Sequence, residues 1–402
     1  MHKLRGSSSR KSESSGNKWY SKRGKGGNDN EATQRDEETP EVTRFMFAVV
    51  TTTEGKADVL QVRRVPRPKP KADEMLVKVS SAGVNRPDIH QRETKLPPWE
   101  GSSDGGSNRR SDYLGLECSG TISEYGVGMS EKDMKAWKIG DKVCAITDGG
   151  SYAQYVAVPV AQLLPFPSNS TSVKEAATFP QAACTVWSEL FMEERLSDAL
   201  QEYEKKGARL SSGETLLIHG GSSSIGTFAI QMAKHQGVTV FVTAGSDEKL
   251  EACRKLGASV CINYRKEAFE KRVLMETEGK GVNVILDCRG EDYFQQNCSC
   301  LSSSGGRLVT IGPNCNTFGQ DSHKESLGRH IVNACALRNR TPEMKALIVK
   351  KVLKHVWPAI RNGSVTASNI KTFTFKQAAE AHALMESGNF IGRILLIPGT
   401  LP

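Results

Sequence analysis

Short apolar runs alternate with segments of helical periodicity through the second half of the chain. Runs that are apolar on both faces indicate the strands of a parallel sheet. Helices between such strands cover both faces of the sheet, and right-handed crossovers make it doubly wound. The predicted strands are residues 215–219, 238–244, 259–263, 282–287 and 306–312, and the predicted helices are residues 225–234, 247–256, 266–278 and 291–301.

The first half shows short strands separated by glycine and proline turns. Residues 75–83 alternate apolar and polar positions, as a strand with one buried face does. We therefore expect an all-β unit from residue 45 to about residue 165. Residues 1–44 hold few apolar side chains and are expected to form a disordered tail. Further predicted elements are strands at 57–65, 371–375 and 392–398, and helices beginning at 86 and spanning 172–192, 197–206, 341–357 and 377–387.

A glycine and serine turn joins the strand 215–219 to the helix that follows it. This order places a helix N-terminus under a bound phosphate, whereas an ordinary tight turn is the simpler alternative. Two glycines allow close backbone approach, the serines offer hydroxyl and N–H groups, and the last glycine lets the helix pack on the strand. The candidate phosphate-binding residues are Gly220, Gly221, Ser222, Ser223, Ser224, Ile225 and Gly226.

The distribution of charge and of cysteine bears on the location of the protein and on its possible partners. The net charge is +9, with lysine and arginine crowded into residues 1–28 and acids into residues 29–41. A solvated tail, a transit peptide and a weak nucleic-acid contact are the alternatives for this segment. The cysteines are scattered and no secretory signal is visible, so we expect reduced thiols in a cytoplasmic protein, with organelle targeting by residues 1–40 left open. No apolar run is long enough for a membrane span.

Several segments in this order resemble the medium-chain dehydrogenase/reductase superfamily over residues 46–398. They are AGVNRPDIHQR, LGLECSGTI, WKIGDKVCA, VTAGSDEKL, INYRKE and GRILLIP. The branch that is most similar is the zinc-free, zeta-crystallin-like NADPH:quinone oxidoreductases. The resemblance implies an α/β fold with a GroES-like β domain of residues 45–171 with 326–402, and a doubly wound Rossmann cofactor domain of residues 172–325.

The end of the second parallel strand decides which nicotinamide cofactor binds. NAD enzymes place Asp or Glu there, but this strand ends in Ser246, and Lys249 follows. Tyr264, with Arg265 after it, lies at the same edge, so these groups can form an anion pocket. In the resembled family, Ser, Lys and Tyr at these places hold the 2′-phosphate, so we predict NADPH. Asp247 is expected to point at its own helix N-terminus.

The resemblance implies further cofactor contacts. Asn85 is expected to position the nicotinamide by bonding ribose or carboxamide groups, although it can also cap the helix that begins at Arg86. No residue stands out as a general acid. Thr185 matches a position near the nicotinamide, and Gly312 lets the backbone pass the ring. The C-terminal contact is matched by Asn389, Gly392 and Arg393.

No zinc site is predicted. Zinc-dependent relatives place Cys and His where this chain has Asn85 and Leu116, and the cysteine-rich lobe of those relatives is missing. Cys118 and Cys144 are expected to be buried as small apolar residues.

Without a Lewis acid, the acceptor must need little activation, and a quinone fits. We therefore predict hydride transfer from NADPH to a quinone. The alternatives are reduction of an α,β-unsaturated carbonyl, or a non-catalytic NADPH-binding protein whose basic tail contacts nucleic acid. Two departures from the family matter: Lys95 or Leu96 stands where many relatives have Tyr, and Ser224 replaces a glycine, which would weaken binding if that position needs a positive φ.

The last predictions concern two insertions and one edge strand of the parallel sheet. Residues 101–112 lie near the expected mouth of the active site and are a candidate lid, and residues 193–209 form a charged helical insertion. A homo-oligomer is expected by resemblance, through the strand 306–312 as an edge of the parallel sheet.

Overall fold

The computed structural model describes residues 44–94, 113–167, 172–192, 207–312, 330–333 and 337–401. The chain divides into two compact units, Met1–Pro40 and Glu41–Pro402. All described residues lie in the second unit. The predicted helix at 197–206 and the candidate lid at 101–112 lie outside them.

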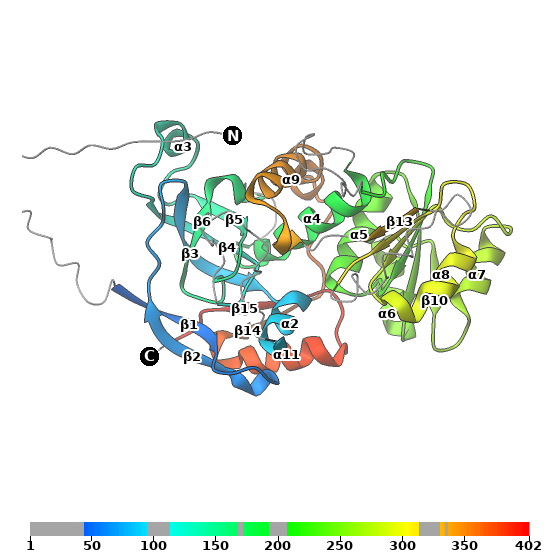
Figure 1. Ribbon diagram of the computed structural model, residues 1–402, viewed down its shortest axis with the longest axis horizontal. Helices are drawn as coiled ribbons and strands as arrows, with labels where there is room; N and C mark the ends of the chain where they lie inside the picture. Colours follow the sequence, from blue (N-terminus) through cyan, green and yellow to red (C-terminus); the bar gives the residue numbers. More distant parts are fainter. Residues whose placement is uncertain are drawn as a thin grey trace, which may run out of the picture. The chain divides into compact units, whose positions relative to one another are not determined.

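A six-stranded parallel sheet forms one half of this unit (Figure 1). Every neighbouring pair is parallel, and the chain starts in the middle of the sheet, steps outward and then crosses to the other side. This is the order of a doubly wound sheet. In spatial order the strands are β10 (Val260–Asn263), β9 (Thr239–Ala244), β8 (Thr215–His219), β11 (Val284–Asp287), β12 (Arg307–Thr310) and β13 (His330–Asn333).

Helices cover both faces of this sheet, as the apolar runs predict. Leu216 of β8 belongs to one core with Phe228, while Leu217, the next residue, belongs to another with Phe269. Adjacent strand residues point to opposite faces, so each face has its own core. The helices are α5 (Ser224–His235) and α6 (Asp247–Leu256) in the first core, and α7 (Phe269–Glu276) and α8 (Phe294–Cys300) in the second.

A mainly antiparallel sheet forms the other half. It packs α2 (Arg86–Thr94) and α11 (Ala378–Ser387) against a core that contains Ile89, Met385 and Ile394. Its strands are β14 (Ile370–Thr374), β15 (Arg393–Ile397), β3 (Glu74–Gly83), β4 (Glu117–Tyr125), β5 (Lys142–Ile146) and β7 (Leu163–Pro165), and β6 (Tyr155–Pro159) pairs with β3.

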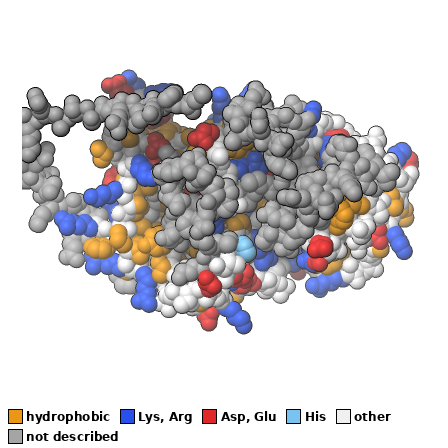
Figure 2. Space-filling model, viewed as in Figure 1, with side chains coloured by type: hydrophobic (Ala, Val, Ile, Leu, Met, Phe, Trp, Pro, Cys, Tyr) orange, Lys and Arg blue, Asp and Glu red, His pale blue; other side chains and the backbone are white. Residues whose placement is uncertain are grey.

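A separate antiparallel pair, β1 (Phe45–Thr51) and β2 (Leu60–Pro66), lies beside this sheet. The guanidinium of Arg64 lies 4.4 Å from the ring centroid of Phe45. Basic and hydrophobic side chains stand together around this pair in Figure 2.

The two sheets share one core, which α4 (Pro180–Val186) helps to build. Cys144 and Leu164 of the antiparallel sheet and Val240 of the parallel sheet belong to the same cluster. In Figure 1, α4 and α9 (Pro342–His355) lie between the two sheets.

Shorter elements are α3 (Glu131–Ala136), α10 (Trp357–Arg361), η1 (Ala57–Val59), η2 (Val160–Gln162), η3 (Glu175–Thr178), η4 (Trp187–Phe191), η5 (Gly290–Tyr293), η8 (Leu337–Asn339) and η9 (Phe375–Gln377).

The prediction for the end of the parallel sheet is wrong. The strand 306–312 was expected at an edge, but β12 lies between β11 and β13, and β13 is the last strand among the described residues. The predicted boundary at residue 325 therefore assigns β13 to the wrong half. β13 is too short for periodicity to reveal it, and its pairing with β12 makes it a strand.

Two smaller predictions change as well. Residues 57–65 begin with the turn η1 before the strand starts at Leu60, and the helix 172–192 is built from η3, α4 and η4. Among the residues that the structure describes, no helix is both long and apolar enough to span a bilayer.

Candidate functional site

The turn between β8 and α5 requires glycine at three places. Gly220 has a φ of +73°. A Cβ on Gly221 would lie 2.7 Å from Cβ of Val242, and one on Gly226 would lie 2.5 Å from the carbonyl oxygen of Gly220. The turn is therefore as tight as predicted, and it joins the carboxyl end of β8 to the N-terminus of α5. The N–H groups of Gly220 and Gly221 are bonded to the Thr243 carbonyl, so among the described residues the unbonded N–H groups lie at the start of α5.

The serines of this turn hold the helix and the C-terminal segment in place. The Ser223 hydroxyl caps α5 by accepting the N–H of Gly226 at 3.1 Å. The Gly392 N–H donates to the Ser222 carbonyl at 2.9 Å, and the Ser224 hydroxyl donates to the Gly392 carbonyl at 2.9 Å. Gly392 therefore lies against the turn.

Ser224 does not need a positive φ. It is the first residue of α5 and is not among the residues with positive φ, so a side chain there causes no backbone strain. The condition under which this serine would weaken cofactor binding is not met.

Four residues gather at the end of β9 and are called the basic rim below: Ser246, Lys249, Tyr264 and Arg265. Ser246 caps α6 by accepting the N–H of Lys249 at 3.4 Å. A Cβ on Gly245 would lie 2.6 Å from the Tyr264 hydroxyl and 3.2 Å from Nε of Arg265. Tyr264 and Arg265 therefore fold over the end of the strand, where only glycine leaves them room.

Lys249 reaches across to the C-terminal segment. Its ammonium donates to the carbonyl of Gly388 at 2.6 Å. The side chain is half-buried beside the rim, so the three residues predicted to hold a 2′-phosphate start from one edge of the sheet.

Asp247 is turned away from its own helix, contrary to expectation. Its carboxylate accepts the amide of Asn263 at 2.9 Å and the ammonium of Lys266 at 2.6 Å. The hydrogen bonds from Lys266 and Asn263 lower the pKa of Asp247. Lys266 also offsets its charge, so this acid opposes a bound phosphate less than a free carboxylate would.

A buried cluster surrounds Glu117 beneath the junction of the two sheets. Its carboxylate forms an ion pair with Arg393, accepts the side-chain amide of Asn85 at 2.8 Å and accepts the N–H of Gln181 at 2.8 Å. The Asn85 amide also donates to the Gly83 carbonyl at 3.2 Å. Both of its protons are thereby used.

The amide protons of Asn85 are therefore bonded within the cluster, and its side-chain oxygen, the atom that would cap α2, faces Arg393. Its contact with the nicotinamide stays a prediction. The side chain turns toward Glu117 rather than capping α2, and Asp88 instead accepts the N–H of Asn85 at 2.9 Å. Asn85 orients Glu117 and Arg393, while its side-chain oxygen lies 3.4 Å from Arg393.

The donor set at this place does not fit zinc. Leu116 is buried and offers no lone pair, and both oxygens of Glu117 are already bonded. Cys118 and Cys144 are buried as expected, and burial raises the pKa of the Cys118 thiol to about 12, away from the thiolate that binds metal. Among the described residues, no group of three His, Cys, Asp or Glu side chains could hold a metal ion.

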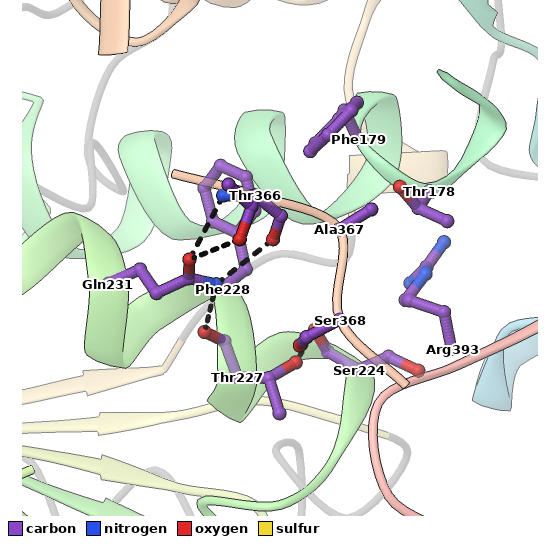
Figure 3. A pocket seen from close by; sticks show the side chains of 10 residues that line it. All are labelled: Thr178, Phe179, Ser224, Thr227, Phe228, Gln231, Thr366, Ala367, Ser368 and Arg393. Atoms are coloured by element: carbon purple, nitrogen blue, oxygen red, sulfur yellow. Dashed lines mark hydrogen bonds between the residues drawn. The ribbon is translucent and has the colours of Figure 1, made fainter. Parts of the chain in front are cut away.

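A small pocket opens beside the first turns of α5 (Figure 3). Buried Thr178 and Arg393 line it, and within the described part of the chain the Thr178 hydroxyl and Nε of Arg393 have no hydrogen-bond partner. Ser224 reaches the same pocket, which has room for roughly one water molecule. It borders Ser224 of the turn 220–226, which we call the phosphate turn after its predicted role.

A second, closely packed hollow, with no room for a water molecule, lies next to Glu117 on the side of α9. Leu116 precedes Glu117 in the chain, and Gln181 stands one helical turn before Thr185 on α4. Thr185 is half-buried. The pocket is lined by Leu116, Ile146, Thr147, Asp148, Gln181, Leu337, Arg338 and Lys345.

Not all of the predicted cofactor-binding residues lie close together. The phosphate turn, Gly392 and Arg393 lie together, and Lys249 touches Gly388. Asn389 is exposed, with its N–H on the Ser387 hydroxyl at 3.1 Å. Gly312 is exposed after β12 with a φ of +104°, and Ile225 is half-buried.

Sequence reasoning placed Arg265 beside Tyr264 at this edge, but it missed the buried residues Gln181, Asp148 and Lys345. Lys345 carried a usable signal, because it shares the buried face of α9 with Ile348, Val349 and Val352. A lysine in an apolar stripe requires a buried partner.

His219 ends β8 with its imidazole buried beneath the turn. Its Nε2 lies 2.7 Å from Oδ1 of Asn297 and its Nδ1 lies 3.0 Å from the Thr243 hydroxyl. An amide oxygen only accepts, so Nε2 donates to Asn297. Burial lowers the pKa of His219 to about 4.

Two family descriptions match the chain. "Alcohol dehydrogenase GroES-like domain" matches residues 71–168, and "Zinc-binding dehydrogenase" matches residues 224–347. A phenolphthiocerol/phthiocerol polyketide synthase of Mycobacterium tuberculosis is 25% identical over 342 residues, which cover 85% of this chain. The chain spans only 14% of the length of that relative.

Solved structures share the fold. A CurK enoyl reductase has a TM-score of 0.72 at 22% identity, and covers 88% of this chain and 99% of its own. An Escherichia coli quinone oxidoreductase complexed with NADPH has a TM-score of 0.69 at 24% identity, with the same coverage.

Proposed function

The chain belongs to the medium-chain dehydrogenase/reductase superfamily, and from this premise we propose that it transfers hydride from NADPH to the conjugated double bond of an α,β-unsaturated carbonyl compound. The observation that carries this proposal is the basic rim beside the phosphate turn. It combines a helix N-terminus, which suits a pyrophosphate, with a rim that suits a 2′-phosphate.

NADPH fits this edge for physical reasons. Ser246 replaces the acid that would bond a ribose 2′-hydroxyl, and the one nearby acid, Asp247, is paired with Lys266. Lys249, Tyr264 and Arg265 offer one ammonium, one hydroxyl and one guanidinium for a phosphate. Bound NADPH supplies the hydride.

In this proposal, the residues of the chain bind NADPH and orient it. The start of α5 holds the diphosphate through the N–H groups of Ser224 and Ile225, and Gly392 closes against the turn. Arg393, fixed by Glu117, faces the pocket beside α5. Among the described residues, the side chains around Glu117 do not fit zinc, so we assign them a positioning role.

Two acceptor classes remain, and both take hydride at a conjugated position. The enoyl class is supported by the polyketide synthase relative and by the enoyl reductase structures that share the fold. A quinone is the second candidate, supported by the quinone oxidoreductase that shares the fold and binds NADPH.

Steady-state oxidation of NADPH and of NADH, with 2-enals, enones and quinones as acceptors, tests the proposal. We expect turnover of enones with NADPH in preference to NADH. Lys249→Ala should weaken NADPH binding roughly 10- to 100-fold, because a charge-assisted bond to phosphate is lost, and should leave NADH binding unchanged.

Lys255→Ala is the matched control, since Lys255 is an exposed lysine on the same helix. Turnover of quinones alone would select the second candidate. NADPH binding without turnover of any acceptor would instead support a binding protein, and salt-dependent nucleic-acid binding that requires residues 1–40 would strengthen that alternative.

A further inference from the structure

The segment 388–392 joins α11 to β15 and is called the strap below. Glycines that allow a sharp change of direction stand at both of its ends, Gly388 with a φ of +65° and Gly392 with a φ of +80°. Gly392 is fixed to the phosphate turn through the Ser222 carbonyl and the Ser224 hydroxyl. One end of the strap therefore lies against the group of residues that we assign to the diphosphate.

A charged hydrogen bond holds the other end of the strap. The Lys249 ammonium donates to the Gly388 carbonyl at 2.6 Å, and the two residues are 139 positions apart in the chain. Gly388 directly follows the last turn of α11, where helix carbonyls carry a partial negative charge that attracts a cation. Since Lys249 belongs to the basic rim, this bond joins the rim to the strap.

The helix before the strap is itself anchored in the antiparallel half. Arg92 of α2 donates to the two carboxylate oxygens of Glu386 at 2.6 and 3.1 Å, and its side chain is fully buried. Glu386 lies in the last turn of α11, two residues before Gly388. Lys249 therefore links a helix of the parallel half to a strap whose first end is fixed in the other half.

The Lys249 ammonium has protons left for a ligand. An ammonium carries three N–H groups, and among the contacts of the described residues Gly388 accepts one of them, so two remain. Tyr264 and Arg265 lie at the end of the same strand and offer further donors to a phosphate. One ammonium can thus bond to a phosphate and to the strap at the same time.

We propose that Lys249 couples the 2′-phosphate of NADPH to the strap, so that NADPH orders residues 388–392 and NADH does not. This inference rests on the proposed function, because it takes NADPH as the cofactor. It gives the chain a second source of cofactor selectivity. The 2′-phosphate strengthens the hold on the strap, and the strap in turn lies against the residues that bind the diphosphate of the same cofactor.

The coupling has a physical source in side-chain entropy. A lysine loses much rotamer freedom when its ammonium is held in one place. The first partner to hold Lys249 bears this entropic cost, and the second partner binds a side chain that is already ordered. The strap and the 2′-phosphate therefore favour each other, and the effect is the same in both directions.

Hydrogen–deuterium exchange of the peptide that contains residues 388–392 tests the inference. The probes are adenosine 2′,5′-bisphosphate and adenosine 5′-monophosphate, each at saturation as judged by calorimetric titration, so no hydride transfer is needed. In the wild-type chain we expect the bisphosphate to slow exchange in the strap roughly 10-fold more than the monophosphate does. Only the bisphosphate carries the group that meets Lys249.

Three variants identify the residue that transmits the effect. Lys249→Met keeps the apolar stem and should raise strap exchange roughly 10-fold without ligand, because a charged hydrogen bond is lost, and the two ligands should then act equally. Tyr264→Phe should weaken bisphosphate binding but keep the strap response at saturation. Lys255→Met removes a lysine of the same helix whose side chain is 76% exposed, and it should change neither property.

The outcomes separate this inference from the proposed function. Equal strap exchange with the two saturating ligands in the wild-type chain overturns the inference, whether or not Lys249→Met folds, and leaves NADPH as the cofactor. Faster exchange with the bisphosphate also overturns it, since the phosphate would then draw the ammonium away from Gly388. No binding of the bisphosphate overturns the proposed cofactor itself. Slower exchange that disappears in Lys249→Met supports the inference, and slower exchange that persists there overturns the role of Lys249.

Discussion

His219 illustrates how one buried residue beneath the site links stability to pH. Its imidazole is enclosed by Asn297, Thr243 and the rings of Phe269 and Tyr293, whose centroids lie 4.7 and 5.0 Å away. A charged ring would lose its hydration there, and for this reason the folded state favours the neutral form.

The folded pKa of His219, about 4, lies below the ordinary value of 6.5. The unfolded chain therefore binds more protons between these values, so stability is full above pH 6.5 and is lost as pH falls toward 4. The loss is about 3 kcal/mol. Urea unfolding of the wild type and of His219→Gln at pH 7 and pH 4 measures it.

We expect the wild type to lose about 3 kcal/mol more than His219→Gln over this interval. Other groups titrate in both chains, including His382, whose pKa burial lowers to about 3, and Asp88, whose pKa burial raises to about 6. The difference between the chains removes their contributions. Equal pH dependence would show that His219 is not held neutral.

At the scale of elements, α5 is the helix on which the site depends. Its N-terminus carries the phosphate turn, and Gly226 places its first turn against Gly220 and Gly221. The helix has almost no freedom to shift, because both carbonyls lie within 2.6 Å of where a Cβ would stand.

Gly226→Ala should therefore push α5 away from the turn. We expect a loss of about 1–3 kcal/mol in unfolding free energy from overpacking, together with weaker NADPH binding because the N–H groups move. Chemical denaturation and fluorescence titration measure the two effects.

Lys234→Ala, an exposed change at the other end of α5, is the control and should stay within about 0.5 kcal/mol of the wild type with unchanged NADPH binding. Wild-type NADPH affinity in Gly226→Ala would mean that the turn does not hold the phosphate.

At the scale of the whole molecule, the two sheets fold around one core, and Glu41–Pro402 forms one compact unit. The C-terminal strand β15 begins at Arg393, so the segment that touches the phosphate turn also completes the antiparallel sheet. The expected homo-oligomer stays a prediction, with β13 in place of β12 as the candidate edge.

A chain of residues 41–402 should fold on its own. We expect its unfolding free energy to lie within about 0.5 kcal/mol of the full chain, because all described core residues are retained. Denaturant unfolding and NADPH titration of both chains measure this. A loss of more than about 2 kcal/mol would show that residues 1–40 contribute to the folded unit.

The sequence alone determined most of the strands and helices of the parallel sheet and the tight glycine turn after β8. Periodicity reports which face of a strand or helix is buried, so the parallel strands β8 to β12, the helices between them and the glycine turn could all be predicted. The rim at Ser246 and Tyr264 was also predictable, since it follows strand ends whose edge is fixed by the topology.

The tertiary structure alone decided which side chains meet. Asn85 turns to Glu117 and Arg393, Lys345 finds Asp148, and β13 joins the sheet. Each of these contacts joins residues far apart in the chain. They depend on how strands and helices pack, and local periodicity carries no information about that choice.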